Sequence, residues 1–197
     1  MTHAKLYQDQ WVKGRLAVKG TVECADRYEI IKSFCERQYK NRPFSICDIG
    51  ANMSYFGLRL CEDFPRCTVV GFEYDNFNMR AAHIAKNHPS RLILLNRKLH
   101  CNDLTILSSC CHFDVVLVLN VLHHVGDEFN AWLTRLQILG DHVIAEFATS
   151  DSRSKKQSKD YSIPLDSKIL GYGKSHIKRG VDRPIVLMSA KRKVQTA

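Results

Sequence analysis

Two acidic residues close two apolar runs in the first half of the chain. Asp48 ends the run at 44–47, and Glu73 ends the β-branched run at 68–72. Short apolar runs bounded by turn residues are typical of buried strands. Residues 50–52 (Gly-Ala-Asn) follow the first acid, and small residues there let the backbone approach a ligand, with the N–H groups of the next helix facing it. Ligands of open α/β sheets bind at such carboxyl ends, so we expect a ligand site here.

The spacing of the small residues argues against a nicotinamide dinucleotide. Dinucleotide-binding loops carry three glycines in the pattern G-x-G-x-x-G. This chain has Gly50, but Asn52 and Tyr55 occupy the positions of the second and third glycines. A nicotinamide-dependent oxidoreductase is therefore disfavoured.

The rest of the chain alternates strand-like and helix-like periodicity. Strands are expected at 44–48, 68–73, 91–95, 114–120, 142–147, 168–173 and 184–190, and helices at 25–40, 56–64, 76–87, 103–107 and 128–139. This alternation predicts an α/β fold with a doubly wound, mostly parallel seven-stranded sheet and helices on both faces. No helix fits between the last two strands, so they should form a C-terminal antiparallel hairpin. The polar segment 149–161 is expected to be a loop.

Length and composition are those of one globular domain. The 197 residues are 45% hydrophobic and 25% charged, which are ordinary values. We expect a basic N-terminal arm at 1–22 (a mobile terminus, a short hairpin or a cover over the substrate), one domain at 23–191 and a basic tail at 192–197. Residues 1–10 are polar and no apolar stretch is long enough to span a bilayer, so we expect a cytoplasmic protein with reduced cysteines and no membrane partner.

The loop after the first expected strand resembles motif I of the class I S-adenosylmethionine-dependent methyltransferases. Asp48-Ile49-Gly50-Ala51-Asn52 followed by Tyr55-Phe56 is similar to the form D-x-G-A-N-x-G-Y-F of FkbM-type members. Ser54 replaces the usual third small residue, which is normally glycine. Leu122-His123-His124 resembles the segment that follows the fourth strand of these enzymes. The resemblance covers about residues 26–191.

This resemblance implies S-adenosylmethionine as cofactor and assigns roles to particular residues. Glu73 would accept hydrogen bonds from the ribose hydroxyls, as acids do in nicotinamide sites, and Asp103 would contact the adenine amino group. The implied cofactor-binding residues are Asp48, Gly50, Ala51, Asn52, Tyr55, Phe56, Glu73, Tyr74, Asp103 and Asn120. The candidates for a catalytic base are His123, His124 and Glu146.

The methyl acceptor stays open at this point. The asparagine–proline tetrapeptide of enzymes that methylate exocyclic nucleobase amines is absent, and Asn120 occupies the aspartate position of the ribose 2′-O-methylating set. A net charge of +9 favours an anionic partner such as RNA or simply high solubility. These observations leave an O or N nucleophile of a small molecule, a sugar, RNA or a protein as the acceptor. The alternative is a non-catalytic methyltransferase-like module that binds RNA or a partner. The sequence does not specify the oligomeric state.

A cluster of thiols near the middle of the chain suggests a metal site only superficially. Cys101, Cys110, Cys111 and His112 lack a paired C-x-x-C unit, which structural zinc sites normally contain. We therefore predict no bound metal.

Overall fold

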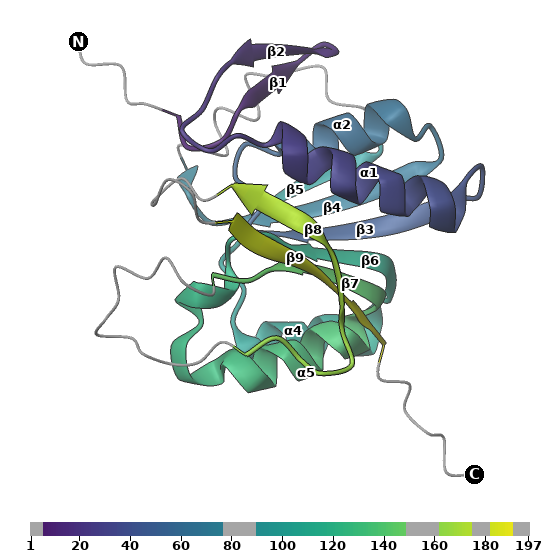
Figure 1. Cartoon of the computed structure of the whole chain (residues 1–197). Coiled ribbons are helices and arrows are strands. Elements are labelled where there is room, and N and C mark those ends of the chain that lie inside the picture. Colours follow the sequence, from purple (N-terminus) through teal and green to yellow (C-terminus); the bar gives the residue numbers. More distant parts are fainter. Residues whose placement is uncertain (1–5, 77–89, 149–161, 175–181, 191–197) are drawn as a thin grey trace.

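A seven-stranded sheet with helices on both faces forms the centre of the computed structural model (Figure 1). The structure describes residues 6–76, 90–148, 162–174 and 182–190. The strands of this sheet are β3 (Phe44–Ile49), β4 (Cys67–Glu73), β5 (Leu92–Asn96), β6 (Phe113–Val118), β7 (Gly140–Glu146), β8 (Lys168–Lys174) and β9 (Asp182–Ser189). The helices are α1 (Ala25–Tyr39), α2 (Tyr55–Asp63), α4 (Cys101–Cys110) and α5 (Phe129–Leu139), with two short 3₁₀ turns, η1 (Leu122–His124) and η2 (Gly126–Glu128).

The strand order confirms the predicted doubly wound topology. The sheet runs β5-β4-β3-β6-β7-β9-β8. Strands β3 to β7 pair in parallel, whereas β9 pairs antiparallel with both β7 and β8. The chain order reverses between β3 and β6, and in such sheets the crevice outside these two carboxyl ends is where ligands bind.

The central strands are buried because both of their faces are covered. All but the second residue of β3 and of β6 are buried, as expected for parallel strands between two helical layers. Helices α1 and α2 cover one face and α4 and α5 the other (Figure 1). Two separate hydrophobic clusters correspond to these layers, one around Tyr28, Ile31 and Leu60 and one around Trp132 and Leu136.

A short hairpin precedes the sheet. Strands β1 (Gln10–Val12) and β2 (Arg15–Val18) pair antiparallel, and both residues of their turn have positive φ, 49° at Lys13 and 75° at Gly14. That conformation matches the strand twist of a tight hairpin. Trp11 Nε1 donates a 2.7 Å hydrogen bond to Glu62 on α2, and the Arg59 guanidinium lies 4.6 Å from the Trp11 ring centre. The hairpin therefore packs against the helix that follows the first strand of the large sheet.

The largest difference from the predicted elements is α4. It begins at Cys101 rather than at Asp103, because His100 is its N-cap and Asp103 completes a capping box at the third helical position. The predicted helix at 76–87 falls almost entirely outside the described residues, as do the loop at 149–161 and the tail at 192–197. No helix in the described ranges is long and apolar enough to cross a membrane.

Candidate functional site

A cavity of about 730 Å³ opens at the carboxyl ends of β3, β4 and β6. Its wall includes the loop after β3, the residues that follow β4 and β5, and the segment from Leu119 to Val125. The N-terminal arm supplies two further residues, Tyr7 and Gln8. The cavity thus lies where the topology predicts a ligand.

The loop after β3 has an unusual backbone. The φ angles of Gly50, Asn52 and Ser54 are 75°, 51° and 58°, a region that costs side-chain-bearing residues energy. A Cβ at Gly50 would lie 2.5 Å from Val121 Cγ2, so only glycine fits. The amides of Gly50 and Ala51 both donate to the Phe72 carbonyl at the end of β4, at 2.9 and 3.0 Å. The loop is thereby fixed to the neighbouring strand.

Glu73 is the carboxylate in the cavity wall. Its side chain accepts three backbone hydrogen bonds, from Asn52 at 2.8 Å, Tyr74 at 2.8 Å and Asp75 at 2.7 Å. These bonds hold the carboxylate in one orientation and tie it to the loop after β3. A carboxylate has about four acceptor positions, so Glu73 can still accept a hydrogen bond from a ligand.

Asp48, on β3, lies on the strand next to that of Glu73. It is 2% exposed and outside the cavity lining, and its Oδ2 has no hydrogen-bond partner among the described residues. Burial, and after it the charge of Glu73, raises the pKa of Asp48 to about 7. The Oδ1 atom of Asn52 is likewise buried without a partner in the described part of the chain. Orphaned buried acceptors are costly, so these oxygens indicate a place where a donor group belongs.

The residues after β6 face the cavity from the other side. Asn120 has a φ of 59°, and its amide donates to the Tyr7 hydroxyl and accepts from Arg183. The rings of His123 and His124 both line the cavity, with centres 3.9 Å apart and planes tilted by 43°. Burial, together with the charge of Arg183, lowers the pKa of His124. His124 is therefore neutral at pH 7 and able to accept a proton.

Several residues predicted to bind the cofactor lie outside the cavity lining. Ala51, Tyr55 and Phe56 are buried, and the Tyr55 ring packs edge-on against Trp11 and Tyr28 at 5.9 and 6.3 Å. The residues of α2 that follow Ser54 thus point toward α1 and the hairpin. Tyr74, by contrast, lies on the rim of the cavity and is 64% exposed.

Asp103 also lies outside the cavity lining. Its carboxylate accepts hydrogen bonds from the His100 amide and from Arg97, both at 2.8 Å. These two bonds lower the pKa of Asp103. The structure therefore gives Asp103 a helix-capping position, while Arg97 and His100 line the cavity in its place.

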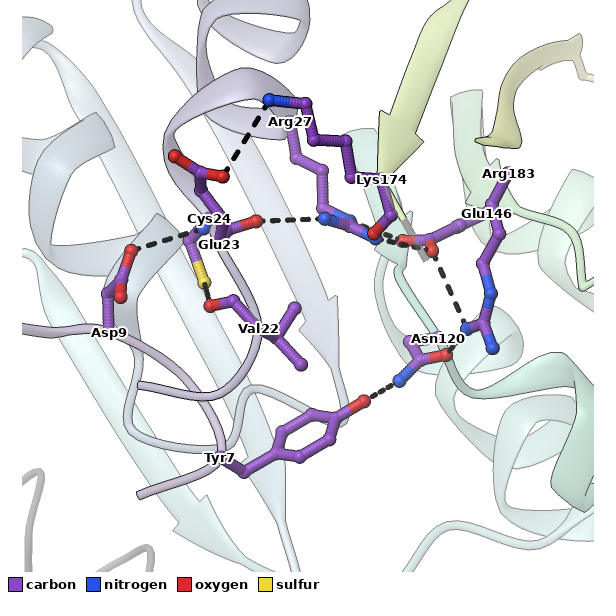
Figure 2. A network of polar contacts seen from close by, with 10 residues as sticks. All are labelled: Tyr7, Asp9, Val22, Glu23, Cys24, Arg27, Asn120, Glu146, Lys174 and Arg183. Carbon is purple, nitrogen blue, oxygen red and sulfur yellow. Dashed lines mark hydrogen bonds and ion pairs between the residues drawn. The ribbon is translucent and has the colours of Figure 1, made fainter. Parts of the chain in front are cut away.

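Glu146, predicted as a candidate base, is buried at the end of β7 and does not line the cavity. Arg27 binds it with two hydrogen bonds, Nε to Oε2 at 2.8 Å and Nη2 to Oε1 at 2.9 Å (Figure 2). Arg183 Nη1 lies 3.6 Å from Oε1. A carboxylate held by guanidinium groups and removed from the cavity is poorly placed to take a proton from an acceptor. The position is that of a structural ion pair.

Sequence reasoning missed several cavity residues, among them Arg97 and His100 after β5. Tyr7 and Gln8 in the N-terminal arm were missed too. They lie in a polar segment without apolar periodicity, and nothing in their spacing marks them as cavity residues. For residues 1–22 the sequence left three expectations open: a mobile terminus, a short hairpin or a cover over the substrate. Among the described residues, no three His, Cys, Asp or Glu side chains are grouped to hold a metal ion.

Ser54 provides a test of local strain. Its backbone is left-handed, it is fully buried, and its Oγ has no partner in the described part of the structure. We expect Ser54→Gly to raise the free energy of unfolding by about 1 kcal/mol, since relief of the strain and of the orphaned hydroxyl exceeds the added chain entropy. Urea denaturation measures this. Ser54→Ala removes only the hydroxyl and should give a smaller change, whereas a destabilised Ser54→Gly would contradict the argument.

Comparisons with known proteins agree with the geometry. Residues 47–139 match the family described as "Methyltransferase domain". No curated protein sequence matches significantly. The bifunctional kinase-methyltransferase WbdD superposes with a TM-score of 0.75 at 21% identity, over 95% of this chain and 44% of that one. This chain thus spans less than half the length of WbdD.

Two further proteins of known structure, which this chain matches over most of their length, have the same fold. The N-terminal domain of EvdMO1, with S-adenosylhomocysteine (SAH) bound, has a TM-score of 0.64 at 16% identity over 96% of this chain and 92% of that one. Magnesium protoporphyrin IX methyltransferase (ChlM) from Synechocystis PCC 6803, with S-adenosylmethionine bound, has a TM-score of 0.60 at 15% identity over 84% and 78%. Residues 47–139 therefore match a methyltransferase domain, and the chain shares the fold of these structures, which bind SAH or S-adenosylmethionine.

Proposed function

We propose that this chain transfers a methyl group from S-adenosylmethionine to an oxygen or nitrogen nucleophile of a small polar acceptor bound in the cavity. The observation that carries the proposal is the fixed Glu73 carboxylate in the cavity wall, hydrogen-bonded to the Asn52 amide, with His123 and His124 in the same cavity. An acceptor of hydrogen bonds and a neutral proton acceptor thus share one site.

The residues present fit the donor. S-adenosylmethionine carries ribose hydroxyls and a methionine ammonium group, which need hydrogen-bond acceptors. Glu73 supplies a carboxylate, and the Oδ1 atom of Asn52, on the adjoining loop, has no partner among the described residues. The cavity of about 730 Å³ falls within the roughly 300–1,000 Å³ typical of small-molecule sites. Residues 50–52, Glu73 and Tyr74 would hold the donor.

The bound donor supplies an activated methyl group on a sulfonium. The chain's own contribution is then to orient the acceptor in line with that group and to exclude water. An alcohol or protonated amine must also lose a proton. His124 is suited to accept this proton because its lowered pKa keeps the imidazole neutral.

The size of the cavity, about 730 Å³, favours a small acceptor over RNA. Tyr7 and Gln8 of the arm form part of its wall. The EvdMO1 domain has been crystallised in the presence of SAH and D-fucose, which is a small polyhydroxylated compound. The net charge of +9 is the argument for RNA, and a non-catalytic module is the remaining alternative.

Calorimetry with S-adenosylmethionine and SAH, followed by labelling, tests the proposal. Saturable binding of both ligands is expected. The purified protein and a methyl-labelled donor are then added to fractionated cell extract, with nuclease and protease controls. Label in the small-molecule fraction supports the proposal, and nuclease-sensitive label would assign RNA instead. Binding without transfer would indicate a non-catalytic module, and the absence of binding would refute donor use.

The pH dependence of methyl transfer tests the role of His124. Because its pKa is lowered, the imidazole is already neutral at pH 7, so the rate should be constant above pH 7 and fall as the pH drops through the lowered pKa. His124→Gln should reduce the turnover number about 100-fold and abolish this fall. SAH formation with the labelled acceptor fraction is the measurement. His112→Gln, at an exposed histidine paired with Asp141, is the control, and an unchanged profile in His124→Gln would exclude His124 as the base.

A further inference from the structure

The N-terminal arm contributes directly to the wall of the cavity. Tyr7 and Gln8 line it together with Gly50, Asn52 and Glu73. Gln8 is only 7% exposed, and its Oε1 has no hydrogen-bond partner among the described residues. A buried amide oxygen without a donor marks a position that a bound molecule or an ordered water completes.

Close contacts with residues 20–22 fix the position of the backbone of the arm. Gln8 forms a parallel bridge with Val22, whose amide donates to the Tyr7 carbonyl at 2.8 Å. Gly20 approaches so closely that a Cβ there would lie 2.3 Å from the carbonyl carbon and oxygen of Gln8. A side chain at position 20 must therefore displace Gln8 from its place in the wall.

The arm is also tied to the start of α1. The Asp9 carboxylate accepts hydrogen bonds from the amides of Gly20 and Cys24, at 2.9 and 3.1 Å. Arg27, one turn further along, donates to the Glu23 carbonyl at 2.8 Å and binds Glu146 at the end of β7. The arm is thus connected through α1 to the carboxyl end of the sheet.

The same network returns to the arm through Asn120 (Figure 2). Arg183, on β9, contacts both Glu146 and the Asn120 side-chain oxygen. The Asn120 amide then donates to the Tyr7 hydroxyl. Burial, and after it the charge of Glu146, raises the pKa of Tyr7 to about 12, so the phenol stays protonated at neutral pH. A continuous set of polar contacts therefore joins the arm, α1, β7, β9 and Asn120 in the loop after β6.

We propose that Tyr7 is a positioning residue of the donor site and that the arm and the bound donor stabilise each other. The inference rests on the proposed function, because it takes the molecule in the cavity to be the donor or its product. Tyr7 holds Asn120 in its left-handed conformation and Gln8 beside the loop at 50–52. Coupling of this kind is reciprocal. A ligand whose binding stabilises the contacts of the arm with residues 20–22 and Asn120 must bind more weakly when these contacts are lost.

Two substitutions loosen the arm in different ways. Tyr7→Phe keeps the ring and removes one hydrogen bond, so we expect the dissociation constant of SAH to rise about three- to tenfold. Gly20→Ala changes no cavity side chain but displaces the Gln8 backbone, and a rise of about tenfold is expected. The matched controls are Tyr28→Phe, which removes a hydrogen bond from a buried tyrosine to Asp63, and Gly14→Ala, which strains the hairpin turn at a φ of 75° although its Cβ would meet nothing within 4 Å.

Hydrogen exchange separates coupling from a merely structural role. SAH should slow amide exchange at residues 6–12 in the wild type and much less in Tyr7→Phe. The inference is supported if both arm variants bind SAH more weakly than both controls and this protection is lost. It is overturned if the wild type binds SAH without protection of the arm, or if both arm variants bind like the wild type. Failure of the wild type to bind SAH at all would instead refute the proposed function beneath it.

Discussion

Replacement of Glu73 by alanine is expected to raise the dissociation constant of SAH about 100-fold, because hydrogen bonds to a charged carboxylate contribute roughly 1.5–3 kcal/mol each. Two effects of this substitution both weaken the binding of SAH. The variant removes the acceptor proposed for the ribose hydroxyls. It also releases the amides of Asn52, Tyr74 and Asp75, which Glu73 holds at 2.7–2.8 Å, so the loop loses its fixed orientation.

Isothermal titration calorimetry with SAH measures this effect. Glu73→Gln should be intermediate, because it keeps one acceptor oxygen but turns an amide N–H₂ toward backbone donors. Glu36→Ala, at an exposed position of α1, is the control and should bind SAH like the wild type. Circular dichroism establishes that each variant is folded. A folded Glu73→Ala protein with wild-type affinity would exclude Glu73 from the donor site.

The position of Glu73 illustrates how much the sequence predicts. Asp48 and Glu73 each end an apolar run, and parallel strands bring such ends to one edge of a sheet. Strand β3 does pair with β4, and the Asn52 amide meets the Glu73 carboxylate. The order of strands and helices followed from the same reasoning, because local periodicity alone determines it. The sheet topology is therefore the part of this molecule that sequence reasoning predicts best.

Side-chain direction was harder to predict. Tyr55 and Phe56 follow the glycine loop, yet the left-handed Ser54 directs them into the core beside α1. The direction of the first side chains of α2 depends on the left-handed backbone at Ser54, which the sequence does not reveal. Asp103 carries a residue type suited to an adenine contact, but the same type also completes a capping box, and here it does. Composition could not distinguish these roles.

Side-chain contacts between residues far apart in the sequence could not be predicted, for a different reason. Arg27 and Glu146 are 119 residues apart in the chain, and no periodic pattern relates them. Tyr7 meets Asn120 only because the arm folds back beside residues 20–22. Both contacts depend on tertiary packing, so the sequence showed Glu146 merely as an acid at a strand end. That position alone suggested a base.

Replacement of Glu146 by alanine should have the largest effect on stability. The side chain of Glu146 is 1% exposed, and those of Arg27 and Arg183 are 3% and 2% exposed. Removal of the carboxylate leaves two guanidinium groups buried without their shared anion. Breaking a buried ion pair in this way costs about 3–5 kcal/mol, and we expect that loss in the free energy of unfolding measured by urea denaturation.

Two further variants distinguish this structural role from catalysis. Glu29→Ala removes the partner of Arg59 from an exposed pair at 3.4 Å and should cost less than about 1 kcal/mol, as surface pairs do. Glu146→Gln keeps the shape and should lose less stability than Glu146→Ala while it still transfers methyl groups. If Glu146→Gln were as stable as the wild type but inactive, the carboxylate would be the proton acceptor after all. The ion-pair geometry argues for the opposite result, because both carboxylate oxygens already accept hydrogen bonds from Arg27 and neither faces the cavity.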